Sequence, residues 1–413
     1  MNWETEKARA VALFVFIPFC KIKCTYCDFN AYANLTRVLE PYSAAVAQEI
    51  RNSQFAARNS TLAPSIYFGG GTPSLLPVAR IAEILRACHD TFAVAPAAEI
   101  TLETNPGTAT AEQLRALHTL GVNRLSLGAQ TFDDAALRRL NRGHTTADTL
   151  ATYEHARRAG FENISLDFIY GLPLQTLADW RATLARAVAL APEHLSLYAL
   201  QVEAQTGLAH QIARGKYAPP DDDLAAEMYE LAQDMLGAAG YAQYEISNWS
   251  VAARDQKLET RDWHNDQPPT SNLQPPTSSF QSRHNLVYWH NEPYLGFGAG
   301  AHSCLGGERF WNVASPVEYI ARVTRGASAI AGRERIDRAL EMAETLILGL
   351  RLNAGITFAA FAARYGEEVQ TKHAQKFAEL QELGLIETDA TRVRLTPRGR
   401  LLSNEVFWRL LPN

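Results

Sequence analysis

The sequence is poor in cysteine and has no long run of apolar residues. Five cysteines among 413 residues are too few for a disulfide framework, so we expect a reducing compartment, the cytoplasm. The first nine residues carry as many acids as bases, and the apolar run 11–19 is short and contains Pro18. We therefore expect neither a signal peptide nor a transmembrane segment.

The chain also lacks a strong excess of charge of one sign. Its 39 Lys and Arg residues against 44 Asp and Glu residues give a net charge of -5. This balance provides no general attraction to nucleic acid or to an anionic membrane, and we expect no nucleic-acid partner. With 47% hydrophobic and 20% charged residues, the composition is that of an ordinary globular protein, and the length favours two domains.

Three of the five cysteines, Cys20, Cys24 and Cys27, lie within eight residues, directly after an apolar segment. A closed zinc site needs four ligands, and no second Cys or His pair follows at a matching distance. A 4Fe-4S cluster normally takes four cysteines, so three would leave one iron open to an exchangeable ligand. A catalytic zinc ion with three protein ligands is the main alternative, and three buried thiols without a metal are another.

Up to about residue 201, short apolar runs alternate with amphipathic helical stretches. This alternation is typical of βα units with a parallel sheet. The expected strands are 12–17, 65–68, 99–102, 124–127, 163–167 and 194–199. The expected helices include 77–91, 111–120, 146–159 and 176–189. Six such units predict an α/β fold, a partial (β/α)6 barrel of the TIM type.

Glycines and polar residues follow the predicted strands, where the loops of a parallel barrel build active sites. Glycines allow close approach of the backbone to a ligand, and an arginine can hold a carboxylate in a bidentate fork. Acidic side chains can accept hydrogen bonds from ribose hydroxyls or an ammonium group. Arg142 together with Glu103 or Asp167 would fit a zwitterionic nucleoside. The residues that follow or end the strands include Gly70, Gly71, Thr72, Glu103, Gln130, Arg142 and Asp167.

The cysteine spacing, with Tyr26 just before the third cysteine, resembles the signature of the radical S-adenosylmethionine (SAM) superfamily. The resemblance implies a 4Fe-4S cluster whose open iron is chelated by the amino and carboxylate groups of SAM. It implies that the seven residues above contact SAM and that Tyr26 packs near the adenine. Electron transfer from the cluster would cleave SAM to a 5′-deoxyadenosyl radical, which requires an electron donor.

From about Val11 to the C-terminus, the chain resembles the family of oxygen-independent coproporphyrinogen III oxidase (HemN) and the HemW heme chaperones. The oxidase branch has a fourth cysteine two residues after the third, where this chain has Phe29. That difference and the segments 244–249, 283–289, 294–302 and 401–407 favour the chaperone branch. The resemblance then implies binding of heme and its transfer to acceptor proteins. A radical SAM oxidoreductase acting on a porphyrinogen is the alternative, and a DNA-binding regulator with an iron–sulfur switch is a more distant one.

Heme iron takes His, Met, Cys or Tyr as axial ligand. We predict His284, because Arg283 could meet a propionate and Tyr288 and Trp289 could cover the macrocycle. His290 and His302 are alternative ligands. A purely structural role for His284 is equally compatible with the sequence.

Two features depart from the family pattern. Phe14 and Phe16 stand where the family usually has Tyr and His, which removes two polar groups near the SAM site. The segment 252–282 interrupts a connection that is normally short, and its near-repeated Gln-Pro-Pro-Thr-Ser sequence predicts a surface insertion.

We divide the chain into a barrel at 1–215, a connecting region at 216–330 and a C-terminal domain at 331–413. The last region is expected to contain helices at 336–352, 358–364 and 369–383, then a hairpin at 384–395 and a final helix through Trp408. Helices followed by a hairpin predict a winged-helix-like domain. Its arginines could contact phosphates, but the family resemblance implies packing beside the mouth of the barrel.

Overall fold

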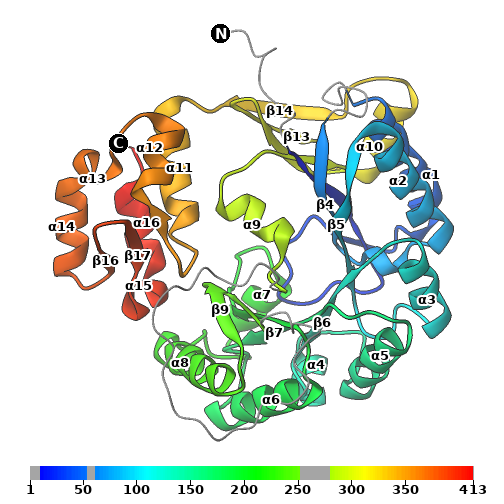
Figure 1. Ribbon diagram of the computed structural model, residues 1–413. Helices are drawn as coiled ribbons and strands as arrows, with labels where there is room; N and C mark the ends of the chain where they lie inside the picture. Colours follow the sequence, from blue (N-terminus) through cyan, green and yellow to red (C-terminus); the bar gives the residue numbers. More distant parts are fainter. Residues whose placement is uncertain (1–9, 54–60, 252–279, 413) are drawn as a thin grey trace, which may run out of the picture.

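The computed structural model describes residues 10–53, 61–251 and 280–412. Within these ranges, the largest sheet has twelve strands and runs through most of the molecule (Figure 1). Its centre consists of seven adjacent parallel strands, in the order β11-β1-β4-β5-β6-β7-β8. The strands are β1 (Ala12–Ile17), β4 (Leu62–Gly70), β5 (Ala93–Thr104), β6 (Arg124–Gln130), β7 (Ile164–Tyr170), β8 (His194–Ala199) and β11 (Tyr294–Phe297). All six predicted strands are therefore present.

The helices that follow these strands cover the outer face of the sheet (Figure 1). The four helices predicted above are confirmed to within one residue at either end, as α2 (Val78–Thr91), α3 (Ala111–Thr119), α5 (Thr146–Arg158) and α6 (Leu177–Leu190). Thr110, Thr145 and Thr176 begin three of them with capping boxes, in which the Thr side chain and the side chain three residues later satisfy exposed backbone N–H groups. These caps fix where each helix begins, and so the length of the preceding loop.

The predicted connecting region, 216–330, contributes strands to the same sheet. β11 pairs in parallel with β1, and three further strands extend that edge in antiparallel fashion. At the other edge, β10 pairs with β8 and β9 with β10. These strands are β9 (Ala242–Glu245), β10 (Asn248–Ser250), β12 (His302–Leu305), β13 (Glu308–Asn312) and β14 (Ile330–Arg335). All of β14 except Ile330 lies in the range predicted for the C-terminal domain, although the strand belongs to the main sheet. The helices of this region are α8 (Asp222–Ala238), α9 (Arg283–Trp289) and α10 (Pro316–Thr324).

Short elements surround the predicted cysteine site. The segment after β1 forms a small parallel sheet of two strands, and single-turn helices follow β4 and β6. The elements are β2 (Phe19–Cys20), β3 (Tyr32–Ala33), η2 (Thr36–Val38), α1 (Leu39–Arg51), η3 (Pro73–Leu75), α4 (Asp134–Arg139) and α7 (Gly207–Ala213).

The C-terminal region has its own apolar core, which includes Leu346, Phe361, Leu380 and Val393. Helices surround a three-stranded antiparallel sheet in the order β15-β17-β16, the arrangement expected of a winged-helix-like domain. The helix predicted at 369–383 is interrupted at His373, where the backbone leaves helical geometry. The elements are α11 (Arg338–Gly349), β15 (Ile356–Thr357), α12 (Phe358–Tyr365), α13 (Val369–Lys372), α14 (Ala374–Glu382), β16 (Ile386–Thr388), β17 (Arg392–Leu395), α15 (Pro397–Leu401) and α16 (Ser403–Leu410).

Backbone hydrogen bonds join the C-terminal domain to the edge of the sheet. The Ile246 N–H donates to the Arg351 carbonyl at 3.1 Å, and the Asn353 N–H donates to the Tyr244 carbonyl at 3.0 Å. Residues 252–279 of the predicted insertion lie outside the described ranges. Among the helices that the structure describes, none is long and apolar enough to cross a bilayer.

Candidate functional site

The three clustered cysteines lie on the loop that leaves β1 and are half-buried. Two hydrogen bonds tie their sulfurs to the barrel: the Thr72 hydroxyl donates to Cys20 Sγ at 3.6 Å, and Arg142 Nη1 donates to Cys24 Sγ at 3.5 Å. Such donors stabilise thiolates. The loop is therefore fixed from two different strand ends, those of β4 and β6.

The glycine turn after β4 also holds the cysteine loop in place, through backbone hydrogen bonds. The Gly71 N–H donates to the Ile17 carbonyl, and the Thr72 N–H donates to the Phe19 carbonyl, both at 2.8 Å. A Cβ at residue 71 would lie 2.6 Å from the Phe19 carbonyl oxygen. Only glycine allows this approach of the two backbones.

The arrangement of the cysteines bears on the choice between zinc and an iron–sulfur cluster. In the part of the chain that is described, no three His, Cys, Asp or Glu side chains converge as ligands of one metal ion. Thiolates of a 4Fe-4S cluster bind different iron atoms, so they need not converge on one point. Three separated sulfurs at the edge of a cavity thus fit a cluster with an open iron better than a mononuclear zinc ion.

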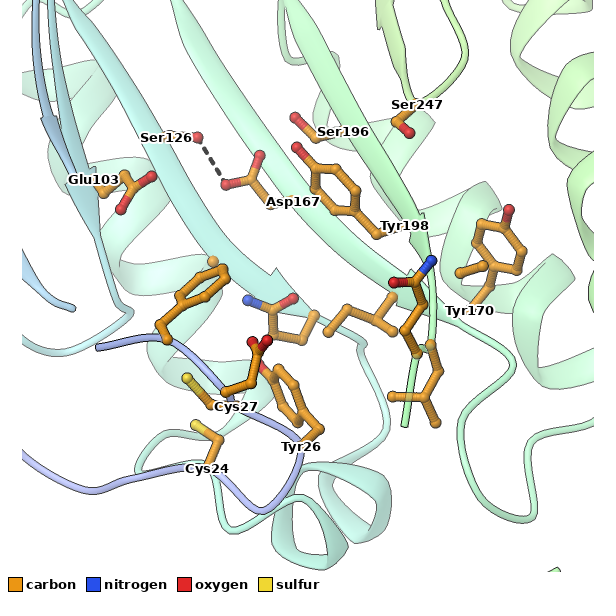
Figure 2. A pocket seen from close by; sticks show the side chains of 18 of the residues that line it. Cys24, Tyr26, Cys27, Glu103, Ser126, Asp167, Tyr170, Ser196, Tyr198 and Ser247 are labelled. Atoms are coloured by element: carbon orange, nitrogen blue, oxygen red, sulfur yellow. Dashed lines mark hydrogen bonds between the residues drawn. The ribbon is translucent and has the colours of Figure 1, made fainter. Parts of the chain in front are cut away.

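A cavity of about 740 Å³ lies between the cysteine loop and the carboxyl ends of the parallel strands. Figure 2 shows Cys24, Tyr26 and Cys27 at one side of this cavity and Glu103 and Asp167 at another. Most of the predicted site residues share its wall: the three cysteines, Tyr26, Gly70, Gly71, Glu103, Gln130, Arg142 and Asp167. Thr72 is not part of the wall. It is buried behind Cys20 and accepts a hydrogen bond from Asn105 Nδ2 at 2.8 Å.

Two carboxylates, one on β5 and one on β7, lie half-buried in the cavity wall, with β6 between their strands. Glu103 accepts hydrogen bonds from the Tyr67 hydroxyl at 2.9 Å and the Gly70 N–H at 3.0 Å. Asp167 accepts from the hydroxyl of Ser126 at 2.7 Å. Burial raises the pKa of Glu103 to about 7, and it also raises the pKa of Asp167. A cationic or hydroxyl-bearing ligand would stabilise the charged forms of both acids.

Arg142 connects the cysteine loop to the strand ends. Its Nη2 donates to Asn105 Oδ1 at 2.6 Å and to the Gly128 carbonyl at 2.7 Å. Its Nε has no partner among the described residues but is closed off from the cavity. The part of Arg142 that can meet a ligand carboxylate is Nη1, whose two contacts are long, both at 3.5 Å. Nearby, Gln130 has a φ of 66° at an irregular position of the β6–β7 pairing. This left-handed conformation is uncommon outside glycine and occurs often at binding sites.

The sequence did not single out several residues of the wall. Arg124 is buried at the start of β6 with an unpaired Nε, and Tyr67 and Asn105 hold Glu103 and Arg142 in place. Asn105 belongs to the polar segment after β5 and could have been recognised from its position. Arg124 could not, because its place at the start of a strand gives no signal of a cavity.

His284 lies outside this wall. Its ring is 1% exposed, with Nδ1 2.9 Å from the Ser65 hydroxyl and Nε2 3.1 Å from the Tyr288 hydroxyl. Burial lowers the pKa of His284 to about 3. Because both ring nitrogens are already hydrogen-bonded, this geometry favours the structural role that the sequence left open over ligation of heme iron.

The other side chains predicted to bind heme iron or a propionate do not line the cavity either. His290 and His302 are exposed and line no part of the cavity, and Arg283 donates to the Ala97 carbonyl at 2.8 Å. Phe14 stacks against Tyr67 and against His284, with ring centroids 5.9 and 6.0 Å apart. The aromatic ring at residue 14 thus packs beside the site and brings no polar atom to it.

Two protein-family models match this chain, one over most of the barrel and one over the C-terminal domain. Residues 14–187 match the radical SAM superfamily, and residues 336–402 match the HemN C-terminal domain. The chain is 35% identical to the heme chaperone HemW of Bacillus subtilis, over 96% of this chain and 98% of the relative. It is 36% identical to the heme chaperone HemW of Synechocystis, over 90% of this chain and 84% of the relative.

A solved structure shares the fold. The coproporphyrinogen III oxidase HemN from Escherichia coli superimposes with a TM-score of 0.80, covering 98% of this chain and 91% of the other, at 22% identity. At this identity the likeness establishes the common architecture, the barrel together with the C-terminal domain.

Proposed function

The chain belongs to the HemW family of the radical SAM superfamily, and on this premise we propose that it is a heme chaperone that binds heme and passes it to acceptor proteins. The observation that carries the proposal is the similarity to HemW chaperones over nearly the whole chain, C-terminal domain included. The identity of the acceptors and the location in the cytoplasm remain predictions.

We further propose that Cys20, Cys24 and Cys27 hold a 4Fe-4S cluster beside a SAM molecule. When bound, this pair supplies one-electron reductive cleavage of SAM, for which an electron donor is required. The residues of the chain would bind and orient this pair: the Arg142 guanidinium lines the cavity and can meet a carboxylate through Nη1, whose two contacts are 3.5 Å long. Gly70 and Gly71 allow backbone approach from β4.

The two half-buried acids complete the proposed SAM site. Glu103 and Asp167 each keep acceptor capacity toward the cavity, because a carboxylate can accept about four hydrogen bonds. Ribose hydroxyls and an ammonium group are donors of the kind that these acids need. Tyr26, which lies beside the Arg142 guanidinium at 3.5 Å, is proposed to pack near the adenine.

The second candidate function is that of a coproporphyrinogen-oxidising radical SAM enzyme, which the shared fold with HemN favours. Against it stands Phe29, which takes the place of the oxidase branch's fourth cysteine. Its side chain is 61% exposed and lines the cavity. A phenyl ring cannot act as the thiol that the oxidase branch places there.

The experiment that separates the two functions is anaerobic reconstitution followed by two assays on the same sample. Hemin titration, read at the Soret band, should show saturable binding. Incubation with SAM, a reductant and coproporphyrinogen III should give no product that depends on the porphyrinogen. Protein that binds no hemin, yet releases 5′-deoxyadenosine only with the porphyrinogen, would establish the enzyme instead.

A further inference from the structure

The cavity extends beyond the proposed SAM site to a second wall, to which the C-terminal domain contributes. Figure 2 shows Tyr170 and Tyr198 on the side opposite Cys24. Aromatic and aliphatic side chains dominate this part, and Tyr198 is 44% exposed inside the cavity. The wall residues of this part include Tyr170, Tyr198, Leu200, Tyr229, Ile246 and Leu401. Such a surface suits a flat apolar ligand.

Two arginines of the C-terminal domain, Arg351 and Arg400, lie in the same wall. Arg351 is 25% exposed, and its guanidinium lies 4.3 Å from the ring centroid of Trp289. A single long contact joins it to a carboxylate, Glu245, at 3.5 Å. Stacking on Trp289 fixes the plane of the guanidinium. Its Nε is closed off from solvent, so a ligand in the cavity would meet the terminal nitrogens.

Arg400, on the short helix α15, has an Nε that is closed off from solvent and unpaired among the described residues. Its guanidinium lies beside the Tyr229 hydroxyl. Burial raises the pKa of the Tyr229 hydroxyl, and Gln243 and Arg400 both oppose that rise. That hydroxyl donates to the Ile246 carbonyl at 3.0 Å, and the Ile246 N–H donates to the Arg351 carbonyl. Both arginines therefore flank the turn between β9 and β10.

This wall combines the exposed ring of Tyr198 with the guanidinium groups of Arg351 and Arg400. A guanidinium binds carboxylates in a bidentate manner. The C-terminal domain brings no acidic side chain to the cavity, since its other wall residues are Leu401, Ser403 and Asn404. The second wall thus favours a planar apolar molecule that carries carboxylates.

We propose that Arg351 and Arg400 bind the two propionate carboxylates of heme, with the macrocycle against Tyr198. The proposal rests on the chaperone function above and assigns its heme site to the junction of the barrel and the C-terminal domain. In this site Arg351 and Arg400 take the role that the sequence assigned to Arg283, whose guanidinium donates to a backbone carbonyl instead. Because no histidine or methionine lines the described cavity, recognition here depends on the carboxylates and the aromatic wall.

The test compares hemin with iron protoporphyrin dimethyl ester, in which the carboxylates are neutral, on the reconstituted full chain. Arg351→Gln, Arg400→Gln and the double variant should each weaken hemin binding, by about tenfold to a hundredfold per site. The ester should bind wild type and variants alike. Arg398→Gln is the matched control, because Arg398 is exposed on the same helix and does not line the cavity.

Cluster absorbance and SAM affinity, measured on every variant, report whether the barrel is intact. If the Gln variants fail to fold, Arg351→Lys and Arg400→Lys replace them and keep the charge. The comparison of hemin with the ester on wild type then still tests whether the carboxylates are recognised. Hemin affinity that is the same in wild type and double variant would overturn the carboxylate site and leave the chaperone function. Wild type that binds no hemin would overturn both.

Discussion

Arg142 illustrates how one side chain serves both loop structure and ligand binding. Four hydrogen bonds hold its terminal nitrogens, two of them to Asn105 and Gly128. The interactions immobilise the guanidinium, so the group is already oriented when a ligand arrives. Preorganisation of this kind increases affinity because less freedom is lost on binding.

Replacing Arg142 by Ala should weaken SAM binding by about 2–5 kcal/mol, because it removes a buried, charge-assisted partner of the SAM carboxylate. Calorimetry on anaerobically reconstituted protein measures this difference. Arg138→Ala is the control, since Arg138 is exposed on the preceding helix. An Arg142→Ala protein that retains its cluster and binds SAM as wild type does would exclude this carboxylate contact.

Each of the three clustered cysteines should be required for the iron–sulfur cluster. Changing Cys20, Cys24 or Cys27 to Ala should abolish cluster absorbance and reduce bound iron and sulfide after reconstitution. Cys88→Ala and Cys304→Ala should retain both, because these thiols lie outside the cavity wall. Isolation of the wild type with stoichiometric zinc and without sulfide would contradict the assignment.

His284 should make the stability of the protein depend on pH. Burial lowers its pKa in the folded state to about 3, whereas the unfolded value lies near 6.5. The neutral ring therefore contributes stability that is fully present above pH 6.5 and is lost as the pH falls toward 3.

Between about pH 6 and 4, the unfolding free energy of wild type should fall more steeply than that of His284→Gln, by about 1.4 kcal/mol per pH unit. Denaturant unfolding at a series of pH values measures both slopes. Parallel slopes would mean that His284 takes up its proton in the folded protein, as an accessible iron ligand would.

At the level of secondary structure, the sequence predicted elements whose signals are local. The apolar runs of β1 and β6 and the capping boxes of α3 and α5 depend on neighbouring residues only. The position of β11 beside β1 depends on a pairing across more than 270 residues. No local pattern distinguishes a parallel strand of four residues from a loop.

In the candidate site too, residues with a local sequence signal were predictable, and residues brought there by another domain were not. Glu103, Gln130 and Asp167 were predictable because they end or follow strands of one barrel, and such residues meet at one rim. Arg351 and Arg400 reach the cavity only because another domain packs there. Their sequence surroundings indicate a helix end and a solvated face, so only the three-dimensional structure reveals them.

The glycine turn after β4 should be the least tolerant part of the barrel rim. Gly71→Ala places a methyl group against the Phe19 carbonyl, which should destabilise the fold by about 1–3 kcal/mol and lower the yield of reconstituted cluster. Gly237→Ala is the control, because that exposed helical glycine has open space around its Cβ position. The control should raise stability by up to about 1 kcal/mol.

Thermal unfolding and iron content measure the two effects of these glycine substitutions. If Gly71→Ala reconstitutes and unfolds as wild type does, the cysteine loop does not depend on the close approach of β2 to the glycine turn.

At the scale of the whole molecule, the described residues form three hydrophobic clusters: a large and a small one in the barrel, and one in the C-terminal domain. Backbone bonds at Tyr244 and Ile246 and the ion pair of Arg309 with Glu344 at 2.7 Å join the C-terminal domain to the barrel. The cavity opens along this junction and carries both the proposed SAM site and the proposed heme site. The position of the C-terminal domain therefore controls the composition of the second wall.

The central claim is that the protein carries heme and gives it up to another protein. The direct test loads the reconstituted protein with one equivalent of hemin, removes the excess and mixes it with an apo hemoprotein, while the Soret spectrum is followed. We predict saturable loading and transfer of the heme to the acceptor at a rate that depends on acceptor concentration. A protein that fails to load, or whose heme appears in the acceptor only at the rate of release into solution, would contradict the account.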